Sequence, residues 1–229
     1  MTLSPLSVRT LFSIGPVPIS EPVAVTWGIM AFLALGSILT TRRLSVTPCR
    51  RQAVLELVVD AVLGQIGDTI RVSARPYLPL IGTLFLFILV ANWSALVPGI
   101  EPPTAHIETD AALALIVFAA VVYFGIRQRG VVGYLATFAE PTILMVPLNI
   151  VESITRTFSL IVRLFGNVMS GVFIVGIVLS LAGLLVPVPL MALDLLTGAV
   201  QAYIFAILAT VFIGSVVAET PRSRERTKQ

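Results

Sequence analysis

The chain has 229 residues, of which 57% are hydrophobic and 12% are charged, and its mean hydropathy is +0.99. Soluble domains are about 45–50% apolar and about 25% charged, so a water-soluble core of this length could not bury so much apolar surface. A formal net charge of +3 is too small to indicate nucleic-acid binding, and one cysteine and one histidine exclude a disulfide framework and a His/Cys metal cluster. The composition predicts an integral membrane protein with no metal or other cofactor.

Five apolar segments are long enough to cross the hydrocarbon core of a bilayer. The first is expected over 22–41, and the Arg42-Arg43 pair after it is typical of a stop-transfer anchor rather than a removable signal peptide. The other four are expected over 77–98, over 110–126, within 145–185 and within 188–218. We found no internal repeat, so the fold class expected is an all-α integral membrane protein, with 1–229 as a single membrane domain.

The fourth and fifth apolar segments are longer than a bilayer is thick. A helix of about 38 residues is about 57 Å long, whereas the hydrocarbon core is about 30 Å thick. We therefore expect the fourth helix to be strongly tilted or to lie partly along the membrane, and the fifth to tilt as well.

An interfacial helix is expected over about 50–72, between the first and second spans. Apolar residues recur there at helical spacing, and the charged residues fall mostly off that stripe, which is typical of an amphipathic helix at the membrane surface. The stripe comprises Leu55, Val58, Val59, Val62, Leu63, Ile66 and Ile70.

Arginine placement predicts the orientation of the chain. Most arginines follow the first, third and fifth spans, whereas the opposite side carries Arg9 and the acidic turn EPPTAHIETD. The positive-inside bias then puts the N-terminus outside and the C-terminus, with its tail 219–229, in the cytoplasm. An odd number of spans agrees with this orientation.

Arg163 lies well inside the fourth apolar segment. An arginine at the centre of a membrane helix costs about 2.5–3.5 kcal/mol on insertion scales, and its guanidinium stays protonated there. Such a side chain must face protein or water, and it makes the residue the first candidate for function.

Small and polar residues share the face of Arg163, because they recur at three- and four-residue spacing. They are Ser159, Gly166, Asn167 and Ser170, and Gly171 widens the stripe. A similar stripe in the fifth segment contains Asp194, Thr197, Gly198 and Gln201. Small residues allow close helix approach, so Ser159, Gly166, Ser170, Gly171 and Gly198 are predicted helix-interface positions. If the two stripes face each other, Gln201 can hydrogen-bond near Arg163 and Asp194 can line a water-filled path.

Three blocks of this sequence resemble subunit a of the F-type ATP synthases. SLIVRLFGNVMSG is similar to the family's arginine motif, GAVQAYIFAILATVFIG to its last helix, and FLFILVANWSALVPG to its second helix. The three blocks occur in the right order and the resemblance covers about 75–218. It implies a non-catalytic stator subunit in a bacterial plasma membrane, whose partners are a ring of carboxylate-bearing rotor subunits (the c-ring), b-type peripheral-stalk subunits and the lipid bilayer.

The resemblance also implies roles for individual residues. Arg163 matches the essential arginine, Asn167 the asparagine one turn later, and Gln201 the glutamine of the last helix. Asp194 falls where relatives have histidine or a carboxylate. Together with Glu152, which we assign to the cytoplasmic half-channel, these are the candidate ion-translocation residues.

Two departures from the family pattern bear on the ion path. Val172 stands where many members have an acid, so the outer half-channel is expected to rely on Asp194. Thr157 stands where many have proline, and the run ESITRT also differs, which indicates a divergent subgroup and raises coupling to Na⁺ as an alternative to H⁺.

Other interpretations of the same residues remain open. Arg163 could form a structural ion pair, although Glu152 lies about 16 Å from it along a helix. Asp194 could be an ordinary first-turn acid, since Pro187 and Pro189 place it near a helix start. The alternative function is a stand-alone secondary transporter that binds an anionic substrate at Arg163, but such proteins commonly contain paired repeats.

Overall fold

A computed structural model describes residues 10–14, 17–42, 50–70, 74–97, 100–139, 144–183 and 186–218. The predicted tail over 219–229 lies outside these residues. The described elements are, in chain order, the strands β1 Thr10–Ile14 and β2 Val17–Ser20, then α1 Glu21–Thr41, α2 Arg50–Thr69, α3 Leu78–Trp93, the 3₁₀ turns η1 Ser94–Leu96 and η2 Pro103–Ala105, α4 Ile107–Ala139, α5 Met145–Ala182 and α6 Pro187–Ala218.

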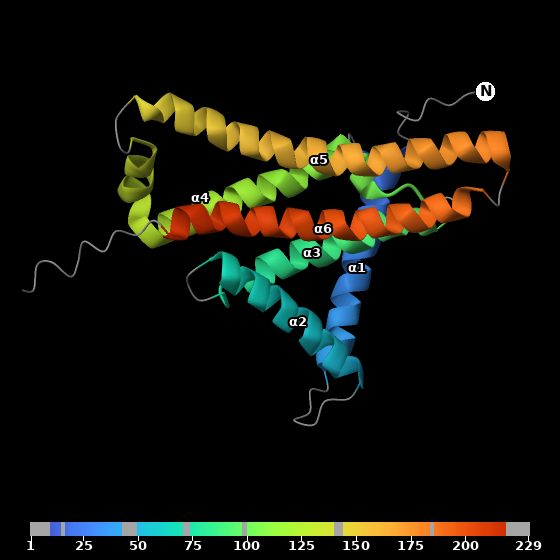
Figure 1. Ribbon diagram of the computed structural model, residues 1–229, viewed down its shortest axis with the longest axis horizontal. Coiled ribbons are helices and arrows are strands. Elements are labelled where there is room, and N and C mark those ends of the chain that lie inside the picture. The colour runs from blue at the N-terminus through green and yellow to red at the C-terminus, as the bar shows by residue number, and fades with distance from the viewer. Residues whose placement is uncertain are drawn as a thin grey trace, which may run out of the picture.

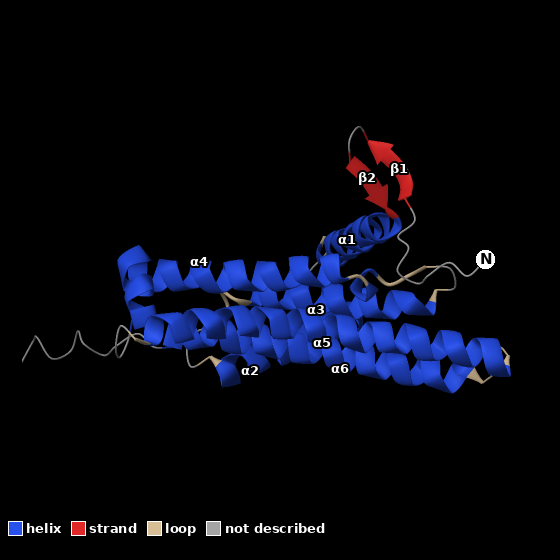
Figure 2. Ribbon diagram, turned by 90° about the horizontal axis from the view of Figure 1, so that it is seen from above, coloured by secondary structure: helices blue, strands red, loops and turns tan. Residues whose placement is uncertain are grey.

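The predicted fold class is confirmed. Five helices, α1, α3, α4, α5 and α6, have the length and hydropathy needed to cross a membrane. The sequence analysis did not anticipate the small antiparallel hairpin of β1 and β2, which stands beside the start of α1 (Figure 2).

Prolines and glycines set several helix boundaries. Pro22 and Pro79 occupy the first turns of α1 and α3, where the missing N–H group costs nothing. At the end of α5, Gly183 has φ 77°, a left-handed conformation that glycine adopts without steric cost.

Helix α4 extends beyond the predicted third span, because the chain becomes helical again after a kink. Gly130 has φ 73° and ψ 168°, which are not helical angles. Only glycine adopts them readily, so the last turns of α4 change direction at this residue. The helix therefore reaches Ala139 rather than ending near 126.

The core lies among α3, α4, α5 and α6, which run alongside one another (Figure 1). Its largest cluster joins residues from all four helices, including Ile88, Val117, Leu164 and Phe205. Helix α1 crosses the direction of α5 and α6 (Figure 1). If α1 stands upright in the membrane, α5 and α6 must therefore lie at a steep tilt, which is what their lengths predict.

The predicted amphipathic helix is α2, and it is anchored to the bundle at its C-terminal end. Ile66 and Ile70 are completely buried, and Ile70 lies so close to α6 that a Cβ atom on Gly214 would be 3.1 Å from its Cγ1. The hydroxyl of Tyr203 on α6 also donates a hydrogen bond of 2.8 Å to Oε1 of Gln65.

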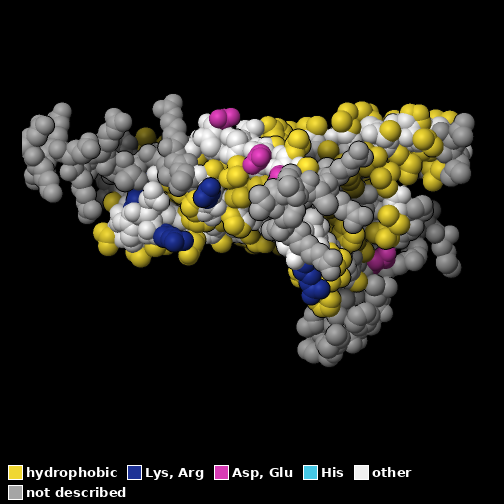
Figure 3. Space-filling view, turned by 90° about the horizontal axis from the view of Figure 1, so that it is seen from below, with side chains coloured by type: hydrophobic (Ala, Val, Ile, Leu, Met, Phe, Trp, Pro, Cys, Tyr) yellow, Lys and Arg dark blue, Asp and Glu magenta, His cyan; other side chains and the backbone are white. Residues whose placement is uncertain are grey.

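Much of the remaining surface is apolar. The large exposed hydrophobic side chains on α1 include Trp27, Phe32, Leu35 and Leu39, and the face in Figure 3 is largely hydrophobic with few charged side chains. Soluble monomers rarely expose contiguous patches of this kind. Lipid is the natural cover for it.

Candidate functional site

Arg163 occupies the midpoint of α5, on the face that the rest of the chain leaves open. The helix buries its apolar stripe, Leu160, Leu164 and Val168, against the core, whereas Arg163 is exposed. Within the described residues Arg163 forms neither an ion pair nor a hydrogen bond. The charge at the centre of α5 is thus not neutralised by a carboxylate of the described chain.

The predicted helix-interface residues fall into two groups. Ser159, Gly166 and Ser170 are exposed beside Arg163, so they are not packed against another helix of this chain. Gly171 and Gly198 lie at close approaches: a Cβ atom on Gly171 would be 2.7 Å from Cγ of Asp194, and one on Gly198 would be 3.0 Å from Cβ of Asn92. The stripe on α6 therefore contacts both α5 and α3.

The antiparallel register of α5 and α6 puts Gln201 at the depth of Arg163. Gly171 lies against Asp194 at one end, and the guanidinium of Arg156 lies 5.3 Å from the ring centre of Phe212 at the other. Interpolation between these two contacts places Gln201 level with α5 residues between Arg163 and Asn167.

Gln201 is buried, and its Nε2 has no partner in the described structure. Nδ2 of Asn167 is also buried without a partner. No hydrogen bond joins Gln201 to Arg163 in the described chain. Buried amide groups are normally satisfied by protein or ordered water, so both side chains have donor capacity left for a ligand or water.

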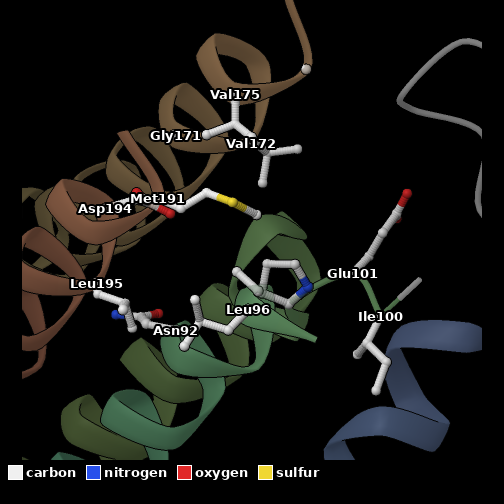
Figure 4. Close-up of a pocket in the computed structure, with 13 residues that line it drawn as sticks. Asn92, Leu96, Ile100, Glu101, Gly171, Val172, Val175, Met191, Asp194 and Leu195 are labelled. Carbon is white, nitrogen blue, oxygen red and sulfur yellow. The ribbon is translucent and has the colours of Figure 1, made fainter. Parts of the chain in front are cut away.

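Asp194 lines a cavity of about 210 Å³. The cavity lies along the C-terminal half of α5, whereas Arg156 is in the N-terminal half. Residues of α3, α5 and α6 surround it, and Glu101 lies on the opposite side from Asp194 (Figure 4). The volume is enough for several water molecules. Val172, one of the two departures from the family pattern, also lines this cavity.

Asn92 on α3, which also lines the cavity, is hydrogen-bonded to both α6 and η2. Its Nδ2 donates a hydrogen bond of 2.9 Å to the carbonyl of Gly198 on α6, and its Oδ1 accepts one of 2.8 Å from Thr104 in η2. Both side chains are buried. The indole of Trp93 adds a hydrogen bond of 3.2 Å to the carbonyl of Leu195. The bonds to Leu195 and Gly198 fix α6 against α3 in the turn that follows Asp194.

Glu152 forms an ion pair with Arg156, one turn later on α5. About half of each side chain is exposed. Glu152, Arg156, Ser159 and Arg163 recur at helical spacing, so the pair continues the open stripe of Arg163 toward the start of α5.

Sequence reasoning missed one titratable residue, Asp110, in the first turn of α4. Asp110 is completely buried, and neither of its carboxylate oxygens has a partner among the described residues. Its spacing from Leu113, Ala114 and Val117 puts it on the buried stripe of α4. That spacing was visible in the sequence and was the signal that could have found it.

The sequence pattern of the ATP synthase A chain family matches residues 23–214. The chain belongs to this family. It is 61% identical over 222 residues to ATP synthase subunit a 2 of Bradyrhizobium sp., covering 97% of this chain and 100% of the relative. It is 51% identical to ATP synthase subunit a 1 of Chlorobaculum parvum, over 95% of each chain. For ATP synthase subunit a of Albidiferax ferrireducens the identity is 46% over 94% of each chain.

Membership of the ATP synthase A chain family, together with five apolar helices of spanning length, identifies a multi-pass membrane protein. It is a stator subunit of the membrane (Fo) sector of an ATP synthase and takes part in ATP synthesis and ion transport. The resemblance found in the sequence motifs is confirmed.

Proposed function

We propose that Arg163 is the fixed cation past which the carboxylates of a rotor ring move, and that this couples ion flow to rotation. The observation that carries the proposal is the exposed position of Arg163 at the midpoint of a helix of 38 residues. An unpaired charge at that depth is costly. A carboxylate on a partner subunit would provide the missing neutralisation.

The electrostatics explain how such a contact drives transport. A ring carboxylate facing lipid is stable only when it is protonated or ion-bound. Beside Arg163 the ionised form is favoured, so the ion is released. The fixed positive charge also blocks direct leakage between two offset half-channels, and the membrane potential supplies about 2.3 kcal/mol per charge per 100 mV.

The half-channels are proposed at the two ends of α5. The cavity of Asp194 would be the outer half-channel, and the open stripe with Glu152 would belong to the cytoplasmic one. Gln201 and Asn167 would supply hydrogen bonds at the depth of Arg163. The transported ion is H⁺ or Na⁺, according to the ion site of the ring, and the protein itself performs no covalent chemistry.

The same proposal assigns partners and orientation. The exposed stripe of α5 would face the c-ring, b-type stalk subunits would hold the chain against rotation, and lipid would cover α1. The N-terminus would lie outside a bacterial plasma membrane and the C-terminus in the cytoplasm.

The decisive experiment measures ATP-driven ion pumping in vesicles that contain the whole complex. Arg163→Ala should abolish pumping while the complex still assembles, and Arg75→Ala, which removes another exposed arginine, should pump normally. Asp194→Asn should impair transport less severely than Arg163→Ala. Normal pumping by Arg163→Ala would refute the proposed role of Arg163, and wild-type rates in Asp194→Asn would remove that residue from the path.

A further inference from the structure

Asp110 is the only acidic side chain that is fully buried in the described part of the chain. Its neighbours on the same stripe of α4, Leu113, Ala114 and Val117, belong to the central apolar cluster. Both of its side-chain oxygens lack a hydrogen-bond donor there. The side chain therefore enters the apolar interior without the partners that an ionised carboxylate requires.

An anionic carboxylate in such a place is unstable unless it binds a cation. The two candidates, a metal ion and a proton, differ in how many ligands they require. A metal ion such as Na⁺ requires several ligands, and within the described residues Asp110 belongs to no group of three or more acidic, histidine or cysteine side chains that could hold one. Thr104, in the 3₁₀ turn before α4, already donates its hydroxyl hydrogen to Asn92. A proton needs no further ligand, so a neutral carboxylic acid is the species that fits.

Two titratable residues that precede Asp110 in the chain, His106 and Glu101, extend from the first turn of α4 to the cavity that contains Asp194. The backbone N–H of Asp110 donates to the carbonyl of His106 at 3.3 Å, so the two residues belong to the same first turn. Nε2 of His106 is buried, has no hydrogen bond in the described structure, and lies 3.5 Å from Oε2 of Glu101. Glu101 in turn lines the cavity that contains Asp194.

Charged groups on the surrounding elements do not neutralise Asp110. Glu101 and Glu108 flank the start of α4, and Arg163 and Asp194 are carried by α5 and α6. None of them forms an ion pair or hydrogen bond with the Asp110 carboxylate within the described residues.

We propose that Asp110 is a proton-carrying acid of the outer half-channel, reached from the cavity through Glu101 and His106. Its carboxylate forms one O–H bond when the proton arrives and returns to the anion when the proton leaves, and no other bond changes. This proposal rests on the proposed function, because a relay at this place has a use only if ions cross the protein. It also commits this chain to H⁺ at that step.

The test compares Asp110→Asn with Glu108→Gln in vesicles of the whole complex, in sodium-free buffer. Asparagine reproduces the shape and neutrality of the protonated acid but cannot exchange a proton. Asp110→Asn should assemble normally and pump protons at least about tenfold more slowly, the lower range for a lost proton-transfer group. Glu108 is exposed on the same turn, so Glu108→Gln should pump like the wild type.

Each other outcome contradicts the proposal. Normal pumping by Asp110→Asn would mean that the residue is only a neutral packing group. Failure of Asp110→Asn to assemble would exclude a neutral acid as the native species, because asparagine matches it in size and charge. A second readout is the infrared carbonyl band of a protonated carboxylic acid, which should be present in the wild type and missing from Asp110→Asn.

The Arg163 experiment separates the two hypotheses. If Arg163→Ala stops pumping and Asp110→Asn does not slow it, the relay fails and the proposed role of Arg163 stands. If Arg163→Ala pumps normally, the proposed role of Arg163 itself fails.

Discussion

Gly171 on α5 lies directly against the carboxylate of Asp194 on α6, with no room for a Cβ atom between them. The contact fixes how far α5 and α6 are apart at the edge of the cavity that Asp194 lines. It also means that the carboxylate lining this cavity is held by the backbone of the helix that carries Arg163.

Gly171→Ala should therefore displace the Asp194 side chain. A new Cβ atom would lie 2.7 Å from Cγ, so either the carboxylate rotates or the helices separate. We expect pumping to slow several-fold while assembly persists. The control is Gly176→Ala, which adds a methyl group in open space on the same cavity wall. Equal rates for the two variants would mean that the position of the Asp194 side chain is unimportant.

Asn92→Leu should weaken the contact between α3 and α6. It removes the hydrogen bond to Gly198 and leaves the Thr104 hydroxyl unpaired, and interhelical bonds in membranes contribute roughly 0.6–1.7 kcal/mol. The midpoint of thermal unfolding in detergent should fall. Thr104→Val should lower it less, and the double variant should lose less than the sum of the two because the residues are coupled.

A matched control for this cycle is Thr83→Val. The Thr83 hydroxyl is exposed and bonds only to its own helix, at the carbonyl of Pro79, so the midpoint should hardly change. Additive losses for Asn92 and Thr104 would show that the network has no joint effect on stability.

Cysteine labelling at position 152 tests whether water reaches the exposed stripe of α5. In a Cys49→Ser background, Glu152→Cys should react rapidly with a water-soluble maleimide added to vesicles. The control is Ile154→Cys, which is also exposed but lies on nearly the opposite side of the helix, where we expect lipid. Comparable labelling of both positions would exclude a distinct aqueous face.

Ile70→Ala should release α2 from the bundle. The side chain is fully buried, and loss of a buried isoleucine costs about 2–5 kcal/mol. Backbone amides of α2 should exchange hydrogen at least about tenfold faster, because local opening becomes cheaper. Leu57→Ala, at a side chain that is 70% exposed on the same helix, should leave exchange unchanged. Unaltered exchange in Ile70→Ala would mean that α2 is held by the membrane surface instead.

Apolar length and helical periodicity were enough to predict the five long helices and α2. They do not specify where a bend occurs, because the left-handed angles of Gly130 depend on the packing of both halves of α4. Nor did they predict the hairpin before α1, whose residues contain no long alternating pattern.

The sequence suggested which residues make up the candidate site, but not which way their helix face points. The spacing around Arg163 placed its neighbours on one face of the helix, yet spacing cannot say whether that face is buried or open. In the structure the apolar stripe of Leu160 and Leu164 packs inward and Arg163 remains outside. Asp110 was overlooked because one acid near a helix start resembles an ordinary first-turn residue.

The outward position of Arg163 has a consequence for biogenesis. A newly inserted copy of the chain, before it meets other subunits, must keep that charge hydrated or drawn toward the headgroups at a cost of about 2.5–3.5 kcal/mol. Under the proposed function a partner carboxylate relieves this cost on assembly, so an unassembled copy would be destabilised by a factor of roughly 100 relative to one in the complex.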